Sequence, residues 1–192
     1  MFKNFVVGQR VSLRPFERSD VGGDYREWIN DPDVVRFLAS GAFPQTDDAL
    51  LAYYESNARS DEQVLFAIME KENGRHIGNA RIYSIDWINR KACRGIMIGD
   101  KSCWSKGYGV EVINLLSYYA FEILNLRKLT SSTVGDNIGI MKVNEKCGYR
   151  QEGCLREEFY RFDRYHDVIY WGILKEDYLS LRKDGKLKGF VE

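Results

Sequence analysis

The chain has 192 residues and carries 28 basic and 28 acidic side chains, so its formal net charge at pH 7 is zero. This length suits one domain with its own core, and the balanced charge excludes a general electrostatic attraction to nucleic acid or to an anionic membrane. The four cysteines lack Cys-x-x-Cys spacing, which argues against a metal site or a disulfide framework and favours a reducing cytoplasm. No apolar stretch has the length of a signal peptide or a membrane span, so we expect a cytoplasmic protein.

The first quarter of the chain predicts one strand followed by helices. Residues 10–16 alternate polar and apolar side chains, as a half-buried strand does. A helix is predicted over residues 19–29, and Pro32 at a first-helical position predicts the start of another. Thr46 precedes two aspartates and an apolar pattern, which predicts the N-terminus of a third helix.

The middle of the chain predicts three strands and a long helix. The strands cover residues 64–69, 76–85 and 92–98, and a turn at residues 72–75 joins the first two as an antiparallel hairpin. Apolar side chains then recur every three or four residues from 110 to 124, which predicts a helix with one buried face.

The last third of the chain predicts a strand, a short helix and a hairpin. The strand covers residues 126–134, and the helix begins at Asn137 and ends at Gly148. Two long strands follow about a turn, over residues 149–160 and 165–174.

The order of these elements predicts a single domain over residues 1–192, in which residues 183–192 form a frayed tail. Strands and helices alternate without internal repeats or linker-like composition. The predicted fold is therefore mixed α/β, with a largely antiparallel central sheet of about seven strands and helices on both faces.

The turn between residues 98 and 110 joins a short apolar strand to the predicted central helix. The N-terminus of a helix offers unpaired N–H groups and the positive end of the helix dipole, which together bind anions. Gly107 and Gly109 let the backbone approach a phosphate closely, and Lys106 adds a positive charge. A tight turn with a solvated lysine explains the same residues without a ligand. The spacing differs from a P-loop, and Val112 stands where a dinucleotide-binding turn has its third glycine.

Residues 104–109, with the sequence Trp-Ser-Lys-Gly-Tyr-Gly, resemble the acyl-CoA signature Arg/Gln-x-x-Gly-x-Gly/Ala of the GNAT N-acetyltransferases. Trp104 stands where that family usually has Arg or Gln. Residues 137–153 and the segments at 13–16 and 28–32 resemble the branch that contains the RimJ/RimL-like and spermidine acetyltransferases. The predicted order of helices and strands is also that of the GNAT fold.

The resemblance implies that an acetyl group passes from acetyl-CoA to a primary amine by direct attack in a ternary complex. In this family pantetheine lies between two splayed strands, where a strand N–H polarises the thioester carbonyl, and the glycine turn holds the pyrophosphate. The residues that the resemblance assigns to the cofactor are Ile96, Met97, Ile98, Trp104, Ser105, Lys106, Gly107, Tyr108, Gly109, Asn137, Lys142 and Lys146.

Three departures from the family pattern bear on the mechanism. Cys93 replaces a glutamate, Ile140 replaces a serine, and Asn144 replaces a tyrosine that acts as general acid in many members. Asparagine can hydrogen-bond a thiolate but cannot protonate it. A missing base also favours acceptor amines of low pKa, because more of such an amine is neutral at pH 7. The candidate catalytic residues are Asn144, Cys93 and Glu111.

The acceptor is expected to enter between the N-terminal helices and the last hairpin. The residues assigned to it are Tyr25, Trp28, Asn30, Asp31, Asp86, Glu157, Tyr160 and Asp167, with Asp86 and Glu157 as further candidate bases. An aminosugar, such as a nucleotide-linked one, or a protein N-terminus is the first hypothesis for the acceptor. The acidic side chains of residues 20–48 leave a polyamine or an aminoglycoside open, and the departures leave open a degenerate module that binds CoA or another protein. The sequence also leaves a homodimer open.

Overall fold

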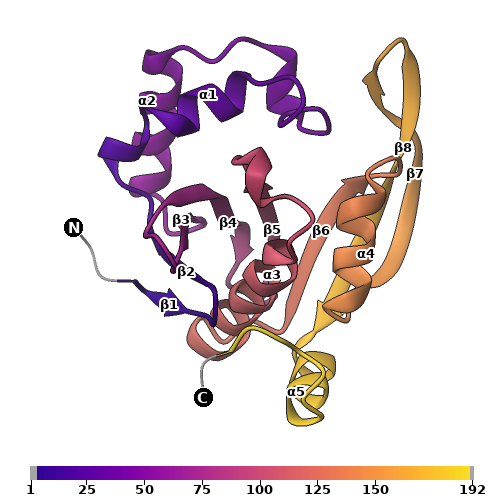
Figure 1. Cartoon of the computed structure of the whole chain (residues 1–192). Coiled ribbons are helices and arrows are strands. Elements are labelled where there is room, and N and C mark those ends of the chain that lie inside the picture. The colour runs from indigo at the N-terminus through magenta and orange to yellow at the C-terminus, as the bar shows by residue number, and fades with distance from the viewer. Residues whose placement is uncertain (1–3, 191–192) are drawn as a thin grey trace.

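The structure, a computed structural model, describes residues 4–190 and contains one eight-stranded sheet with the strand order β1-β2-β3-β4-β5-β6-β8-β7 (Figure 1). The strands are β1 Val6–Val7, β2 Val11–Pro15, β3 Val64–Glu70, β4 His76–Asp86, β5 Lys91–Ile98, β6 Lys128–Val134, β7 Arg150–Arg161 and β8 Arg164–Leu174. Neighbouring strands are antiparallel except β5 and β6, which are parallel. The predicted strands are confirmed, and β1 adds a pair of residues that the sequence pattern did not reveal.

Helices cover both faces of the sheet, as the sequence predicts. They are α1 Asp24–Asn30, α2 Asp47–Ala58, α3 Tyr108–Tyr118, α4 Ile138–Lys146 and α5 Lys175–Lys183, and a π-helical turn, Tyr119–Ile123, continues α3. The side chains of Thr46 and Asn137 accept hydrogen bonds from N–H groups of α2 and α4, which confirms both as N-caps.

The alternation of side chains along β3 divides the interior into two clusters. Phe66 and Ile68 belong to the larger cluster, which α3 covers, whereas Ala67 belongs to a second cluster with Tyr25 of α1 and Leu50 of α2. Neighbouring residues of a strand point to opposite faces, so each face of the sheet receives its own helices. Among residues 4–190 no helix is both long and apolar enough to cross a lipid bilayer.

Two predictions about irregular segments are wrong. Pro32 does not start a helix, because residues 32–37 form turns in which the N–H of Asp33 donates to the Asp31 carboxylate at 2.9 Å. The tail is not frayed as far as residue 190: Asn114 of α3 donates to the carbonyl of Lys188 at 2.8 Å, and Phe190 forms a bridge with Gly8. These tertiary contacts order a segment whose charged sequence alone predicts fraying. Residues 191 and 192 of the predicted tail lie outside the described range.

Candidate active site

The parallel strands β5 and β6 pair over only three positions, from Lys91–Lys128 to Cys93–Thr130. On its other side β5 pairs with β4 as far as Ile98. Residues 95–98 are only partly buried although β5 lies in the middle of the sheet. We call the side of residues 94–98 that faces β6 the open edge of β5, since no strand among the described residues pairs with it. Its N–H and C=O groups can bind an extended amide-containing chain.

The 104–109 turn follows the open edge and leads into α3. Gly107 has a φ of +83°, which favours glycine, and it is the N-cap of α3. The first N–H groups of α3 have no intrahelical partner, so they form an anion site at the positive end of the helix dipole. The indole N–H of Trp104 donates to the carbonyl of Ile98 at 2.8 Å, which folds the turn back onto β5.

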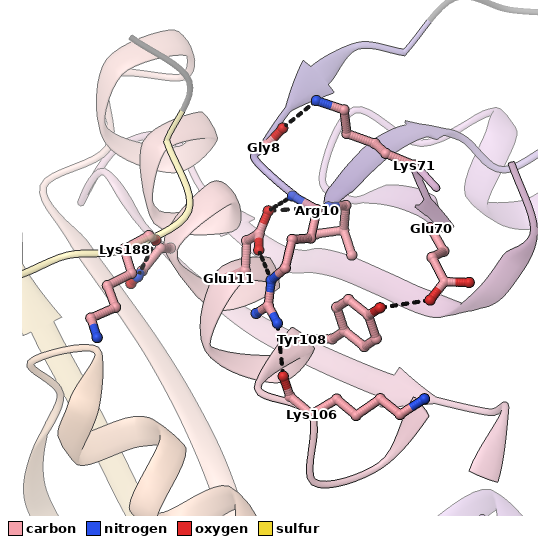
Figure 2. Close-up of polar contacts among 10 residues, drawn as sticks. Gly8, Arg10, Glu70, Lys71, Lys106, Tyr108, Glu111 and Lys188 are labelled. Atoms are coloured by element: carbon pink, nitrogen blue, oxygen red, sulfur yellow. Dashed lines mark hydrogen bonds and ion pairs between the residues drawn. The ribbon is translucent and has the colours of Figure 1, made fainter. Parts of the chain in front are cut away.

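Arg10, just before β2, adds a positive charge to the 104–109 turn. Its guanidinium donates to the carbonyl of Lys106 at 2.8 Å and lies 4.9 Å from the ring centre of Tyr108, and half of its side chain is exposed (Figure 2). Sequence analysis missed Arg10, because the residue lies about a hundred positions from the turn and carries no local motif.

Glu111 joins α3 to the start of β2 and faces neither the open edge nor solvent. Its carboxylate accepts the N–H groups of Arg10 and Val11 at 2.7 and 3.1 Å and pairs with the Arg10 guanidinium at 3.1 Å (Figure 2). The residue is only 2 % exposed. These structural contacts occupy the carboxylate of Glu111, the residue that the sequence offered as a catalytic candidate.

A buried hydrogen bond fixes the first residue of α3. The hydroxyl of Tyr108 donates to Glu70 at 2.6 Å, and Glu70 also pairs with Arg75 at 3.1 Å (Figure 2 shows the first of these contacts). The bond to Glu70, followed by burial, raises the pKa of Tyr108 to about 12, so its hydroxyl stays protonated at neutral pH. This bond holds the anion site against β3.

Three lysines that the resemblance assigns to the cofactor are exposed and form no ion pair within the described chain: Lys106, Lys142 and Lys146. Together with the α3 N-terminus and the open edge they suit a ligand that has phosphates at one end and an extended amide chain at the other. These residues fit acetyl-CoA, with the pyrophosphate at the turn and pantetheine along Ile96, Met97 and Ile98.

On the side of β4 and β5 that α1 and α2 cover lies a cavity of about 290 Å³, which we call the acceptor pocket. Its lining comes from α1, α2, the 3-10 turn Ala39–Ala42, β3, β4 and β5. Gly95, Ile96 and Met97 belong to this lining, so one strand borders both the open edge and the acceptor pocket.

A family model described as an acetyltransferase (GNAT) domain matches residues 10–150. The chain belongs to the GNAT acetyltransferases. The structure is similar to the crystal structure of spermidine N-acetyltransferase from Vibrio cholerae in complex with CoA and spermine, with a TM-score of 0.82 and 28 % identity over 88 % of this chain and 98 % of that one. A Bacillus subtilis protein named as a probable N-acetyltransferase, YjcK, is 32 % identical over 79 % of this chain and 87 % of its own length. The spermidine N(1)-acetyltransferase of Escherichia coli K12 is 26 % identical over 90 % of each chain.

This GNAT acetyltransferase uses acetyl-CoA, and its fold is the one that the sequence resemblance implied. Asn144, at the position of the usual tyrosine, is fully buried on α4. Its side-chain oxygen accepts a hydrogen bond from Arg94, and its amide nitrogen lies 3.4 Å from the hydroxyl of Thr133. Asn144 thus bridges Arg94 of β5 and Thr133 of β6, and its contact with a thiolate stays a prediction.

Arg94 of β5 is the partner of Asn144, and no local motif marks it in the sequence. Arg94 directly follows Cys93, the last residue of β5 that pairs with β6. It is 3 % exposed, and its guanidinium lies 4.4 Å from the ring centre of Tyr149. Cys93, one residue earlier, contacts the Thr130 hydroxyl at 3.2 Å. Among the hydrogen bonds of the described residues, none joins the Cys93 thiol to a base. A nucleophilic thiol needs such a base, so these contacts do not activate Cys93.

The acetyltransferase places the predicted acceptor residues of α1 at or beside the pocket. Tyr25 lines it. The ring of Trp28 packs against the backbone of Gly99, where an added Cβ would lie 2.1 Å from a ring atom. Asn30 exchanges two hydrogen bonds with the backbone of Gln45, and Asp31 pairs with Lys101 at 2.7 Å. Asn30 and Asp31 therefore fix the pocket rim and the 98–104 segment.

The other predicted acceptor residues lie outside the pocket lining. Asp86 accepts two hydrogen bonds from Asn89, and these bonds lower the pKa of its carboxyl group. The N–H of Glu157 donates to Asp167 at 2.9 Å, while the Tyr160 ring packs on Tyr165. These contacts stabilise a turn and the long β7–β8 hairpin. The sequence predicted the length of this hairpin but not where it lies relative to the pocket.

The β7–β8 hairpin nevertheless reaches the rim of the acceptor pocket through one residue. Arg161 donates to the carbonyls of Leu38 and Gly41 at 3.0 and 2.9 Å. Leu38 lines the pocket. The structure thus brings the last hairpin to the N-terminal segment, as predicted, by a residue that the sequence did not single out.

Proposed function

We propose that this acetyltransferase acetylates a primary amine that binds in the acceptor pocket, by direct attack on acetyl-CoA held along the open edge of β5. The observation that carries this proposal is the position of Gly95, Ile96 and Met97, which border the pocket on one side and belong to the open edge on the other. A thioester at the edge and a nitrogen in the pocket would meet at this strand.

The backbone of β5 would supply the main electrostatic stabilisation of the transition state for acetyl transfer. An N–H group of residues 95–98 that points to the open edge can donate to the thioester carbonyl as negative charge develops there. One such donor lowers the barrier by about 3 kcal/mol. The anion site at Gly107 and the exposed lysines would hold the phosphates, so the remote binding energy would position the thioester.

Among the described residues, the pocket lining contains no carboxylate or histidine that could remove a proton from the amine. An alkylamine with a pKa near 10 is unprotonated in roughly one part in a thousand at pH 7, a penalty of about 4 kcal/mol. We infer that water carries the proton to solvent and that the enzyme favours amines whose pKa is lower.

The relatives bear on the acceptor. The similar proteins from Vibrio cholerae and Escherichia coli are named as spermidine acetyltransferases, which supports the polyamine alternative better than an aminosugar or a protein N-terminus. A homodimer and a cytoplasmic location stay predictions.

The proposal is tested in two steps. Calorimetric titration with acetyl-CoA should give saturable binding, and release of free thiol from acetyl-CoA should then depend on an added amine. A protein that shows no heat and no thermal shift with acetyl-CoA contradicts the proposal. Saturable binding without thiol release across polyamines, aminosugars, aminoglycosides and peptides would support the degenerate module.

A further inference from the structure

The acceptor pocket contains a guanidinium and no carboxylate. Arg81 of β4 is the one charged residue of its lining, and no Asp or Glu side chain borders the cavity within residues 4–190. Arg81 forms no ion pair with a described carboxylate; its guanidinium lies 3.3 Å from the Tyr53 hydroxyl and 4.1 Å from the ring centre of Tyr83. A cation in this setting favours a negatively charged ligand group.

Asn79 provides a second and independent sign of a ligand. The residue is 7 % exposed and lines the pocket, yet neither its side-chain oxygen nor its side-chain nitrogen has a hydrogen-bond partner. Buried amide groups are normally paired, so an unpaired one in a cavity wall indicates a ligand that completes its bonds. One oxygen that accepts and one nitrogen that donates suit a ligand with both N–H and oxygen groups.

Arg81 and Asn79 act on the same space. They are two residues apart on β4 and therefore point to the same face of the sheet, while Ala80 between them is buried in the cluster on the other face. In the β4–β5 register Asn79 lies opposite Met97 and Arg81 lies opposite Gly95. Asn79 is thus beside the strand where acetyl transfer is proposed, and the absence of a side chain at Gly95 makes room for Arg81, whose Nε would lie 3.4 Å from an added Cβ.

Two tyrosines also belong to the lining. Tyr53 comes from α2, and Tyr25 comes from α1 and is 6 % exposed. Burial raises the pKa of Tyr25, so its hydroxyl stays neutral and can donate. The polar groups of the pocket therefore offer several donors and one full positive charge.

We infer that the acceptor is a primary amine that also carries a carboxylate or a phosphate, with the anion at Arg81 and the Tyr53 hydroxyl and the amine beside Asn79. This inference rests on the proposed acetyl transfer, and it departs from the polyamine alternative that the relatives support because the pocket lining carries a cation and no carboxylate. A polyamine would bring several positive charges to a guanidinium in a partly enclosed site, where like charges repel without a compensating carboxylate.

Matched amines test the inference. Thiol release from acetyl-CoA is measured for 4-aminobutyrate against butylamine, for glucosamine 6-phosphate against glucosamine, and for spermidine. Each pair differs mainly in one anionic group, and the two pairs separate carboxylate from phosphate recognition. We expect kcat/KM to be about tenfold higher for the anionic member of at least one pair, and higher than for spermidine.

Arg81→Gln should reduce that preference to less than about threefold, through a lower kcat/KM for the amine that carries the anionic group, while the acetyl-CoA affinity stays unchanged. Arg18→Gln is the matched control, because Arg18 is exposed and its carboxylate partner is Glu55 at 3.7 Å. Equal rates within both pairs, spermidine as the preferred substrate, turnover of none of the five amines, or an unchanged preference in Arg81→Gln would each overturn the inference. In all four cases intact acetyl-CoA binding would leave the coenzyme site of the proposed function standing.

Asn79→Leu distinguishes a ligand-binding role of Asn79 from a structural role, because the two roles predict opposite changes in thermal stability. If the unpaired amide awaits a ligand, the substitution should raise the midpoint of thermal unfolding of the free protein, because two unpaired buried polar atoms are removed, and should lower kcat/KM for the preferred amine about tenfold. A lower midpoint, or an unchanged kcat/KM, would contradict the assignment of Asn79 to the acceptor.

Discussion

The proposed coenzyme site and the proposed acceptor pocket of this acetyltransferase are assembled in different ways. The open edge, the 104–109 turn and the start of α3 are nearly contiguous in sequence, so the strand, the glycines and the helix N-terminus form one local unit. The acceptor pocket instead combines residues from Tyr25 to Met97 on three helical and three strand segments. A binding site built from neighbouring residues can be predicted from the sequence. A pocket built from distant segments can be recognised only in the folded structure.

Asn144→Leu should give the largest effect, because it breaks the contact between Arg94 of β5 and α4. The substitution leaves the buried guanidinium of Arg94 with the ring of Tyr149 and no amide oxygen. We expect the free energy of unfolding to fall by about 3 kcal/mol in urea denaturation. The double variant Arg94→Met/Asn144→Leu removes the charge as well and should recover most of that loss. A double variant no more stable than Asn144→Leu would show that Arg94 is not the reason for the loss.

Gly107→Val should weaken acetyl-CoA binding without reshaping the acceptor pocket. A β-branched residue at a φ of +83° strains the backbone that presents the α3 N–H groups, and the new Cβ would lie 3.4 Å from Arg10. We expect about a tenfold or larger increase in the dissociation constant, measured by calorimetry, which corresponds to at least about 1.4 kcal/mol. Gly153→Val is the control, because an added Cβ there meets no atom within 4 Å. Equal affinities in the two variants would refute the role of Gly107.

Arg161→Met should affect the acceptor pocket and spare the coenzyme site. Loss of its bonds to Leu38 and Gly41 frees the rim, so we expect the KM for the amine to rise about threefold at constant acetyl-CoA affinity, roughly 0.7 kcal/mol. Arg164→Met is the matched control, since Arg164 lies on the same hairpin and pairs with Asp136. A rise in the acetyl-CoA dissociation constant instead would mean that the two regions are coupled.

His76 lies where the two regions meet, and it should give the smallest effect. Its ring packs against Trp28, and burial lowers its pKa below the ordinary value of 6.5. The unfolded chain then binds a proton as the pH falls through about 6.5 and the folded chain does not, so stability declines toward lower pH, by up to about 0.5 kcal/mol between pH 7 and about 6.2. His76→Gln should flatten this part of the stability profile. An unchanged slope in the variant would assign the pH dependence to other groups.

The sequence was a good guide where a residue acts through its neighbours in the chain. Gly107 and Gly148 stand at positive φ, and Thr46 and Asn137 cap the helices that their spacing predicted. The order of such signals predicted the mixed α/β fold, and the resemblance at residues 104–109 and 137–153 indicated the GNAT family. Each of these features depends on backbone conformation within a few residues, which composition and periodicity encode.

The sequence was a poor guide where a residue acts across the fold. Arg10, Arg94 and Arg161 look like ordinary surface arginines in the sequence, but each bonds a segment at least 50 positions away. Glu111 had the position of a catalytic group on the central helix, and its fixed contacts with the start of β2 are visible only in three dimensions. Long-range pairing is decided by tertiary packing, which one sequence does not display.

Amide hydrogen exchange with and without acetyl-CoA reports directly on the backbone groups proposed to bind the coenzyme. We predict slower exchange at residues 95–98 and 108–110 on saturation with acetyl-CoA, with little change in residues 150–174 of the last hairpin. Saturable acetyl-CoA binding without protection at residues 95–98 would contradict the assignment of the open edge of β5 to the thioester.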